Sequence, residues 1–211
     1  GYVASPDAET KVDQFYVDAF LELRDQYAHD SSKLQLDYIN PNTGETNKND
    51  DGEEVEKTLT DVQNRHIKDS AQLAKYIPKN VKIIDLGSGA GFPGVILAIL
   101  GWEVVCIESI GKKTKFLNEL KEKLDLPNLT IINDRIENFL SKTPVNAGKF
   151  VFTARAFAPL IKIFDYTHKT NCRLFLLKGR EIETEIATAK SRYKFDYKLH
   201  KSETGDGFII C

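Results

Sequence analysis

A glycine-rich segment is the part of this sequence whose residue types and spacing most clearly indicate chemistry. An apolar run over 81–86 leads into Asp85-Leu-Gly-Ser-Gly-Ala-Gly-Phe-Pro-Gly94, and a second apolar run follows it. Glycines at the end of a strand allow tight turns that bring the backbone close to a bound nucleotide or a related cofactor. We therefore predict a loop that binds such a cofactor, with a tightly packed loop that binds nothing as the alternative.

The glycine spacing fits two classes of cofactor. Gly89-x-Gly91-x-x-Gly94 satisfies the dinucleotide fingerprint of NAD(P)-linked oxidoreductases, whereas Asp85-x-Gly87-x-Gly89-x-Gly91 is the pattern of methyltransferases that use S-adenosylmethionine. Pro93 favours the second class, because it removes an N–H donor at about the first helical position, where a pyrophosphate would bind. S-adenosylmethionine has no phosphate, so it loses nothing at this proline.

Two acidic residues stand at the ends of predicted strands. Asp85, just before the loop, would complement the cationic sulfonium and ammonium groups of S-adenosylmethionine. Glu108 follows the apolar run over 103–107 and is expected to accept hydrogen bonds from the two ribose hydroxyls of either cofactor. The sequence thus favours S-adenosylmethionine and leaves an NAD(P)-linked oxidoreductase as the alternative.

The residues after the run over 149–154 bear on the methyl acceptor. They read Arg155-Ala-Phe-Ala-Pro159, not the Asp/Asn-Pro-Pro-aromatic loop of exocyclic-amine methylation, and no cysteine stands in the Pro-Cys or Ser-Cys loop that cytosine C5 methylation needs. An acceptor with a free lone pair, such as guanine N7, needs no general base, so positioning can supply most of the acceleration. We expect Arg155 to contact a guanine or a phosphate and Phe157 to stack on an extruded base, with a surface ion pair and a core phenylalanine as alternatives.

Alternating strands and helices must position these residues. Apolar runs predict strands near 81–86, 103–108, 129–133, 149–154 and 173–178, and helical periodicity predicts helices near 93–100, 111–124, 135–140, 157–167 and 181–192. This order predicts an α/β fold of the Class I, Rossmann-like methyltransferase type, with a mostly parallel sheet that ends in an antiparallel hairpin over 193–200 and 208–211. We place this domain at 79–211, after an N-terminal helical extension over 1–78 with helices over 11–27 and 58–77 and an acidic loop over 40–52.

The charge is unevenly distributed along the chain. The 211 residues carry 29 Lys and Arg against 31 Asp and Glu, a net charge of −2. Residues 1–60 hold 5 basic and 14 acidic side chains, so this part is net −9 and the remainder is net +7. Because attraction to a polyanion depends on the local field, a basic body behind an acidic front is compatible with binding nucleic acid.

Composition also excludes several classes of protein. The longest apolar block, over 95–100, is far shorter than the roughly 18 residues that a membrane span needs, and the sequence shows no signal-peptide pattern. Cys106, Cys172 and Cys211 are too few and too widely spaced for a disulfide framework or a zinc site. We therefore expect a cytoplasmic protein with no metal and no membrane partner, and a monomer by default.

Several motifs together resemble the RsmG (GidB) family. Besides the glycine loop they comprise Arg65-His-Ile-Lys-Asp-Ser70, Glu108-Ser-Ile-Gly-Lys-Lys-Thr-Lys-Phe-Leu117, Arg135-Ile-Glu137, Arg155-Ala-Phe157 and Leu177-Lys-Gly179. The resemblance covers about 65–186, and the Gly-Phe-Pro-Gly and Arg-Ala-Phe elements make it much more specific than the glycines alone. The chain departs from the family before 65, where an acidic, Asn-rich segment replaces a Trp-Asn pair and an Asn-Leu-Thr segment.

The resemblance implies transfer of a methyl group from S-adenosylmethionine to N7 of a guanine in the 16S rRNA of the small ribosomal subunit. It also implies cofactor contacts at Gly87, Phe92, Ile136, Glu137 and Arg155, with adenine lying beside Ile136 and Glu137. The alternative for Glu137 is a solvated residue in the first turn of a helix. A non-catalytic module that binds RNA or the ribosome, and a methyltransferase for protein or small molecules, remain open as other functions.

A set of basic and aromatic residues is expected to contact RNA around the cleft. Its members are His66, Lys112, Lys113, Phe157, Lys178 and Arg180. Lys112 and Lys113 open a predicted helix, where the helix dipole disfavours cations, so a contact with RNA phosphate would explain them as well as a solvated surface would. His66 has a packed helix residue as its alternative, and Asp69 is placed to pair with Arg65 one helical turn away.

Overall fold

A computed structural model of the chain describes residues 66–211. The expected helix over 11–27, the acidic loop over 40–52 and residues 58–65 of the expected helix over 58–77 therefore lie outside the described residues. The division of the chain at residue 78 stays a prediction. Residues 66–77 are not separate from the body that follows them, because Ile67, Leu73 and Ile77 are buried in the same apolar cluster as α4.

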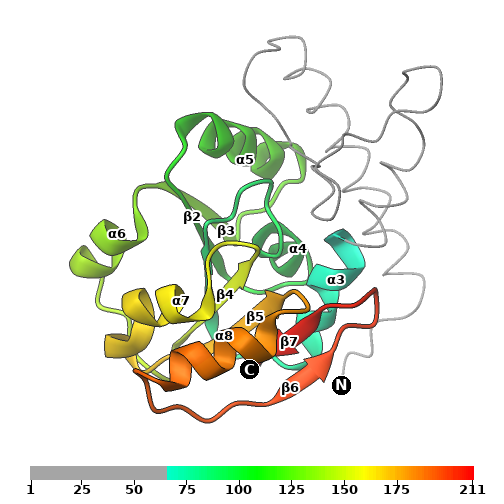
Figure 1. The fold of residues 1–211 in the computed structure, drawn as a ribbon. Helices are drawn as coiled ribbons and strands as arrows, with labels where there is room; N and C mark the ends of the chain where they lie inside the picture. Colours follow the sequence, from blue (N-terminus) through cyan, green and yellow to red (C-terminus); the bar gives the residue numbers. More distant parts are fainter. Residues whose placement is uncertain (1–65) are drawn as a thin grey trace, which may run out of the picture.

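A seven-stranded sheet forms the centre of the described part, in the order β3-β2-β1-β4-β5-β7-β6 (Figure 1). The strands are β1 (Lys82–Leu86), β2 (Val104–Glu108), β3 (Leu129–Asn133), β4 (Phe150–Arg155), β5 (Arg173–Lys178), β6 (Leu199–Lys201) and β7 (Phe208–Ile210). The first five pair in parallel, and β7 pairs antiparallel with both β5 and β6. The predicted α/β class, parallel sheet and closing hairpin are confirmed.

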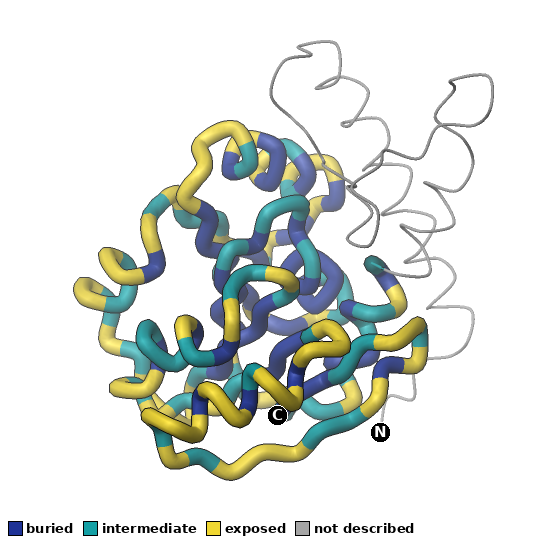
Figure 2. The backbone as a smooth tube through the Cα atoms, viewed as in Figure 1, coloured by how far each residue is buried: buried dark blue, intermediate teal, exposed yellow. Residues whose placement is uncertain are grey.

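Helices cover both faces of this sheet. They are α3 (Lys68–Ala71), η2 (Gln72–Lys75), α4 (Gly94–Ile99), α5 (Gly111–Lys123), α6 (Ile136–Lys142), α7 (Leu160–Thr167), η3 (His168–Thr170) and α8 (Ile182–Lys190). The apolar side chains of η2, α4 and α5 bury one cluster, and those of α6, α7 and α8 bury a second cluster on the opposite face. The result is a three-layer body whose strands are buried between the helices (Figure 2).

The strand order reverses beside β1. From β1 the chain passes through α4, β2 and α5 to β3, and α6 then carries it back to β4 on the other side of β1. In open α/β sheets, ligands bind at the carboxyl ends of the strands that flank such a reversal. Because β1 and β4 are neighbours, the fold brings the loop after β1 and the loop after β4 together at this edge of the sheet.

Two elements differ from their predicted bounds for physical reasons. The expected strand over 193–200 forms only as the short strand β6, because β7 has just three residues to pair with it. The aromatic side chains of Tyr193 and Phe195, which precede β6, pack their rings on Phe164 instead, and the Phe195 and Phe164 centroids are 4.5 Å apart. The helix expected from 157 begins at Leu160, because Pro159 is extended and Ala156 has a left-handed φ of 47°.

No helix in the described part is long and apolar enough to cross a membrane.

Candidate active site

The glycine loop lies between the ends of β1 and α4 and packs closely on its neighbours. Gly87 has a φ of 65°, and a Cβ at this position would overlap the ring of Phe157. A Cβ at Gly94 would lie 2.5 Å from Sγ of Cys106 and 2.8 Å from Oδ2 of Asp85. Glycine is thus needed at Gly87 for conformation and space and at Gly94 for space alone.

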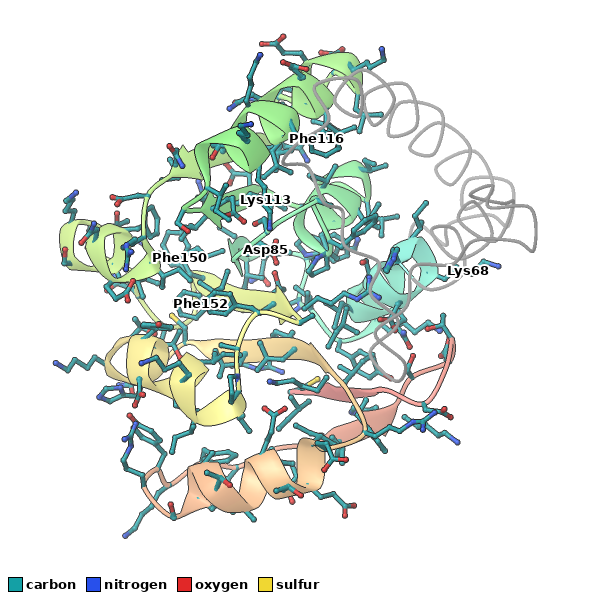
Figure 3. The ribbon with its side chains drawn as sticks, turned by 45° about the horizontal axis from the view of Figure 1, so that its top comes forward. Lys68, Asp85, Lys113, Phe116, Phe150 and Phe152 are labelled. Atoms are coloured by element: carbon teal, nitrogen blue, oxygen red, sulfur yellow. The ribbon has the colours of Figure 1, made fainter. Side chains whose placement is uncertain are left out.

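Asp85 lies beneath this loop, inside the molecule (Figure 3). Its Oδ1 accepts a hydrogen bond of 2.7 Å from the Thr153 hydroxyl, and its Oδ2 faces the backbone at Gly94 without a hydrogen bond of normal geometry. Burial raises the pKa of Asp85 to about 6. The expectation of a direct cofactor contact is corrected here, because a side chain with no exposed surface supports the loop and acts on a ligand only through its charge.

Glu108 ties the glycine loop to the loop after β2. One carboxylate oxygen accepts a hydrogen bond of 3.0 Å from the Gly89 N–H, and the other accepts one of 2.9 Å from the Ile110 N–H. Each oxygen keeps a further lone pair. The lone pairs therefore fit the expected ribose contact, which stays a prediction because Glu108 is only 5% exposed.

The expected adenine contacts divide into a buried and an exposed part. The Ile136 side chain is only 6% exposed and belongs to the core, so the apolar wall expected from it is not formed by this side chain. Its backbone N–H opens α6, where no intrahelical partner exists for it, and Glu137 is exposed in the same turn. Ile110, which the sequence reasoning missed, is 49% exposed beside Glu108 and supplies an apolar surface at this edge.

Arg155 is held at the end of β4 by two groups from the start of the described chain. Its Nη1 lies 2.5 Å from Nδ1 of His66, and its Nε lies 3.5 Å from Oδ2 of Asp69. Because a guanidinium only donates, Nδ1 of His66 is the acceptor, so this ring nitrogen carries no proton. Asp69 is thus bonded to Arg155, while its sequence-based partner Arg65 lies outside the described residues.

The glycine loop and the end of β4 meet around the His66 ring. The ring centroids of His66 and Phe92, a residue of the glycine loop, are 5.2 Å apart, and Arg155 lies on another side of the imidazole. Phe157 packs on Gly87 from the loop after β4. The structure thus brings together five residues predicted from the sequence to contact cofactor or RNA, namely His66, Gly87, Phe92, Arg155 and Phe157.

The residues predicted to form a basic rim differ in their surroundings, and their contact with RNA stays a prediction. Lys112 and Lys113 lie in the first turn of α5, and Arg180 is exposed and pairs with Asp206. Lys178 is corrected as an RNA contact, because its side chain is 8% exposed and Nζ donates to Glu185 at 2.6 Å and to the Ala158 carbonyl at 2.7 Å. Among residues 66–211, no group of His, Cys, Asp and Glu side chains is placed to hold a metal ion.

Lys178 and Glu185 instead hold the loop that carries Arg155 and Phe157. The carboxylate oxygen of Glu185 that binds Lys178 also accepts a hydrogen bond of 2.6 Å from the Leu160 N–H, at the start of α7. Glu185 was not predicted from the sequence, nor were Thr153, Ser202 and the role of Asp69. These residues show no local motif, since their partners come from distant segments.

Comparison with known proteins places this geometry in a family. The model of the family GidB, rRNA small subunit methyltransferase G, matches residues 46–205. The proteins named ribosomal RNA small subunit methyltransferase G from Rickettsia prowazekii (strain Madrid E) and Orientia tsutsugamushi (strain Ikeda) are similar to this chain. The first is 42% identical over 160 residues, which are 74% of this chain and 80% of that protein. The second is 41% identical over 157 residues, which are 72% of this chain and 76% of that protein.

Solved structures support the fold. A SAM dependent methyltransferase from Aquifex aeolicus aligns with a TM-score of 0.55 at 16% identity, over 73% of this chain and 94% of that one. A chain of a fibrillarin/Nop5p complex aligns with a TM-score of 0.51 at 14% identity, over 69% and 79% of the two chains. These likenesses establish the Rossmann-like methyltransferase fold, and the family model together with the relatives shows that this chain belongs to the rRNA small subunit methyltransferase G (GidB) family.

Proposed function

We propose that this protein transfers a methyl group from S-adenosylmethionine to N7 of a guanine in the 16S rRNA of the small ribosomal subunit. The family and the fold support methyl transfer to rRNA. The observation that carries the proposal is that the Phe157 ring packs against Gly87, while Arg155 contacts the His66 ring that lies beside Phe92 of the glycine loop. A base-contacting pair is thus adjacent to the loop of the methyl donor. From this substrate we infer that the protein acts in the cytoplasm.

The residues around the loop fit S-adenosylmethionine. Glu108 has free lone pairs for the ribose hydroxyls, and Ile110 and the backbone N–H of Ile136 offer an apolar surface and a donor for adenine. The buried carboxyl of Asp85 places potential negative charge beneath the loop, where it favours a cationic ligand. When bound, this cofactor supplies a methyl group on a positively charged sulfur.

Positioning is the contribution that the protein makes to the reaction. Guanine N7 carries a lone pair and no proton, so no residue has to remove one, and in-line alignment supplies most of the acceleration. Phe157 stacks on the guanine after it leaves the RNA helix, and Arg155 donates to its O6 or to a neighbouring phosphate. His66 is not needed as a base, because its Nδ1 is engaged by Arg155.

Transfer of a labelled methyl group tests this function directly. The purified protein is incubated with labelled S-adenosylmethionine and small subunits that lack the modification, and the labelled nucleotide is located by mass spectrometry of RNA fragments. We expect the label on N7 of one guanine in 16S rRNA. Label on protein, or binding of subunits with no label, would overturn the proposal, and so would calorimetric binding of NAD without binding of S-adenosylmethionine.

A further inference from the structure

A polar cluster joins the end of β4 to two segments that lie far from it in the sequence. It consists of Asp69, Gln72, Ser202 and Thr204, and we call it the hairpin cluster because Ser202 and Thr204 belong to the loop between β6 and β7. The Ser202 side chain is buried, and the Asp69 side chain is 15% exposed. The cluster lies outside both the glycine loop and the loop after β4, and none of its members is needed to contact a cofactor.

The two carboxylate oxygens of Asp69 have different partners. Its Oδ1 accepts from Gln72 Nε2 at 2.6 Å, from Ser202 Oγ at 2.9 Å and from Thr204 Oγ1 at 3.0 Å. Three donors saturate this oxygen and fix the plane of the carboxylate. The other oxygen, Oδ2, is thereby aimed at Nε of Arg155, 3.5 Å away.

Ser202 lies at the centre of the cluster. Its hydroxyl donates to Asp69 and accepts from Gln72 Nε2 at 3.0 Å and from the Thr204 N–H at 3.2 Å. The Glu203 N–H donates to Oε1 of Gln72 at 3.0 Å, which closes the contact between the hairpin and η2. The position of Asp69 therefore depends on the hairpin as well as on its own helix.

Arg155 is consequently held at two points of its guanidinium. His66 accepts at Nη1 and Asp69 faces Nε, so two different nitrogens of the guanidinium are held by the start of the described chain. Holding a planar donor in one orientation before the substrate arrives reduces the entropy lost on binding. An arginine that met only solvent would have to be ordered in each catalytic cycle.

We propose that Asp69 and Ser202 are positioning residues for Arg155, so that the closing hairpin forms part of the methyl-transfer centre. The inference rests on the proposed function of Arg155 in placing the target guanine. Asp69→Asn separates the two roles of the carboxylate, since the amide oxygen still accepts from the cluster while its NH₂ group faces the guanidinium with donors. Ser202→Ala removes the central hydroxyl and leaves the Asp69 charge.

The chain offers a matched control in the same contact. Lys75 and Glu203 form an exposed ion pair of 2.7 Å between η2 and the hairpin loop. Glu203→Gln weakens this pair without touching Asp69 or Ser202, and the backbone bond from residue 203 to Gln72 remains. A role of the hairpin in stability alone would affect all three variants in the same way.

Single-turnover methyl transfer at saturating cofactor tests the proposal. We expect Asp69→Asn to lower the rate about 30-fold, as for the loss of one close and largely buried ion pair, with an affinity for S-adenosylmethionine within about 3-fold of the wild-type value. Ser202→Ala should lower the rate about 5-fold, as for a neutral hydrogen bond, and Glu203→Gln should leave it unchanged. In an Arg155→Ala background, Asp69→Asn should have no further effect, because it acts through the missing side chain. A full additional loss in that background would overturn the proposal.

A second measurement does not depend on activity. The Nε–H signal of Arg155 in ¹⁵N NMR spectra, assigned by its loss in Arg155→Lys, should exchange slowly in the wild-type protein and in Glu203→Gln. It should exchange rapidly in Asp69→Asn. If the wild-type protein transfers no methyl group but these exchange rates differ as expected, the proposed function fails and the positioning holds. Equal exchange rates in all variants would refute the positioning even where transfer is observed.

Discussion

Replacing Asp85 by asparagine should change how the stability of the protein depends on pH. Asp85 is fully buried under the glycine loop, and burial raises its pKa to about 6, from 3.8 for an unperturbed carboxyl. The folded state therefore binds this proton more tightly than the unfolded chain does. The contribution of Asp85 to stability is full below pH 3.8 and is lost as the pH rises through 6.

The size of the effect follows from the difference between the two pKa values. About two units correspond to about 3 kcal/mol, since one unit is about 1.4 kcal/mol. Asparagine keeps an oxygen that accepts from the Thr153 hydroxyl, and it has no proton to lose in this range. Its NH₂ group in place of Oδ2 adds a cost that is constant with pH. Only the pH dependence of the difference between the two proteins is therefore diagnostic.

Urea unfolding between pH 4 and pH 8 measures this difference. The single tryptophan, Trp102, is buried and hydrogen-bonded to the Pro78 carbonyl, so its fluorescence reports loss of the core. From pH 4 to pH 8, Asp85→Asn should gain about 2.5 kcal/mol in free energy of unfolding relative to the wild-type protein, because the unfolded carboxyl is already about half ionised at pH 4. Asp196→Asn, at an exposed position, is the control and should change stability little at any pH. A difference between Asp85→Asn and wild type that stays constant with pH would refute the reasoning.

Three further perturbations test the packing and charge of the site. Gly94→Ala should lower the free energy of unfolding, measured in urea, by about 2 kcal/mol, because the added Cβ would meet Cys106 and Asp85. Gly179→Ala is the control, because a Cβ there meets nothing within 4 Å, and it should leave the free energy of unfolding unchanged. Lys178→Met should lower the free energy of unfolding by about 2 kcal/mol in the same assay and should slow methyl transfer. It leaves the Ala158 carbonyl and the half-buried Glu185 carboxylate without their donor. Lys112→Gln should reduce the slope of log affinity against log salt for RNA by about 1, in filter-binding titrations; an unchanged slope would remove it from the RNA surface.

The fold was predictable because its signals are local. Apolar runs of strand length, each followed by a helical pattern, determine a parallel sheet with helices on both faces whatever the detailed contacts are. The prediction failed where a strand depends on a partner, as at 193–197, since the alternating aromatic residues there carry a strand pattern but face no strand of matching length. Pairing is a property of two segments, and periodicity describes only one.

The candidate site was predictable to the extent that its residues follow strand ends. Gly87, Glu108 and Arg155 were found because the carboxyl ends of β1, β2 and β4 meet at one edge of the sheet. Burial was not predictable from that rule: Asp85, Glu108 and Lys178 all stand at strand ends, yet all three are largely covered by neighbouring segments. A charged residue at a strand end is well positioned to contact a ligand. Whether it can do so depends on how far the neighbouring segments bury its side chain.

The two carboxylates that hold Arg155 and the loop after β4, Asp69 and Glu185, are consistent with a reaction that removes no proton. A general base must be free to accept a proton, but Asp69 is saturated on one oxygen and faces Arg155 with the other, and Glu185 binds both Lys178 and the start of α7. Carboxylates engaged in this way hold loops and a guanidinium in place. Attack by a ring nitrogen that already carries a lone pair needs that placement and nothing more, so the same arrangement that makes these groups poor bases suits them to methyl transfer by alignment.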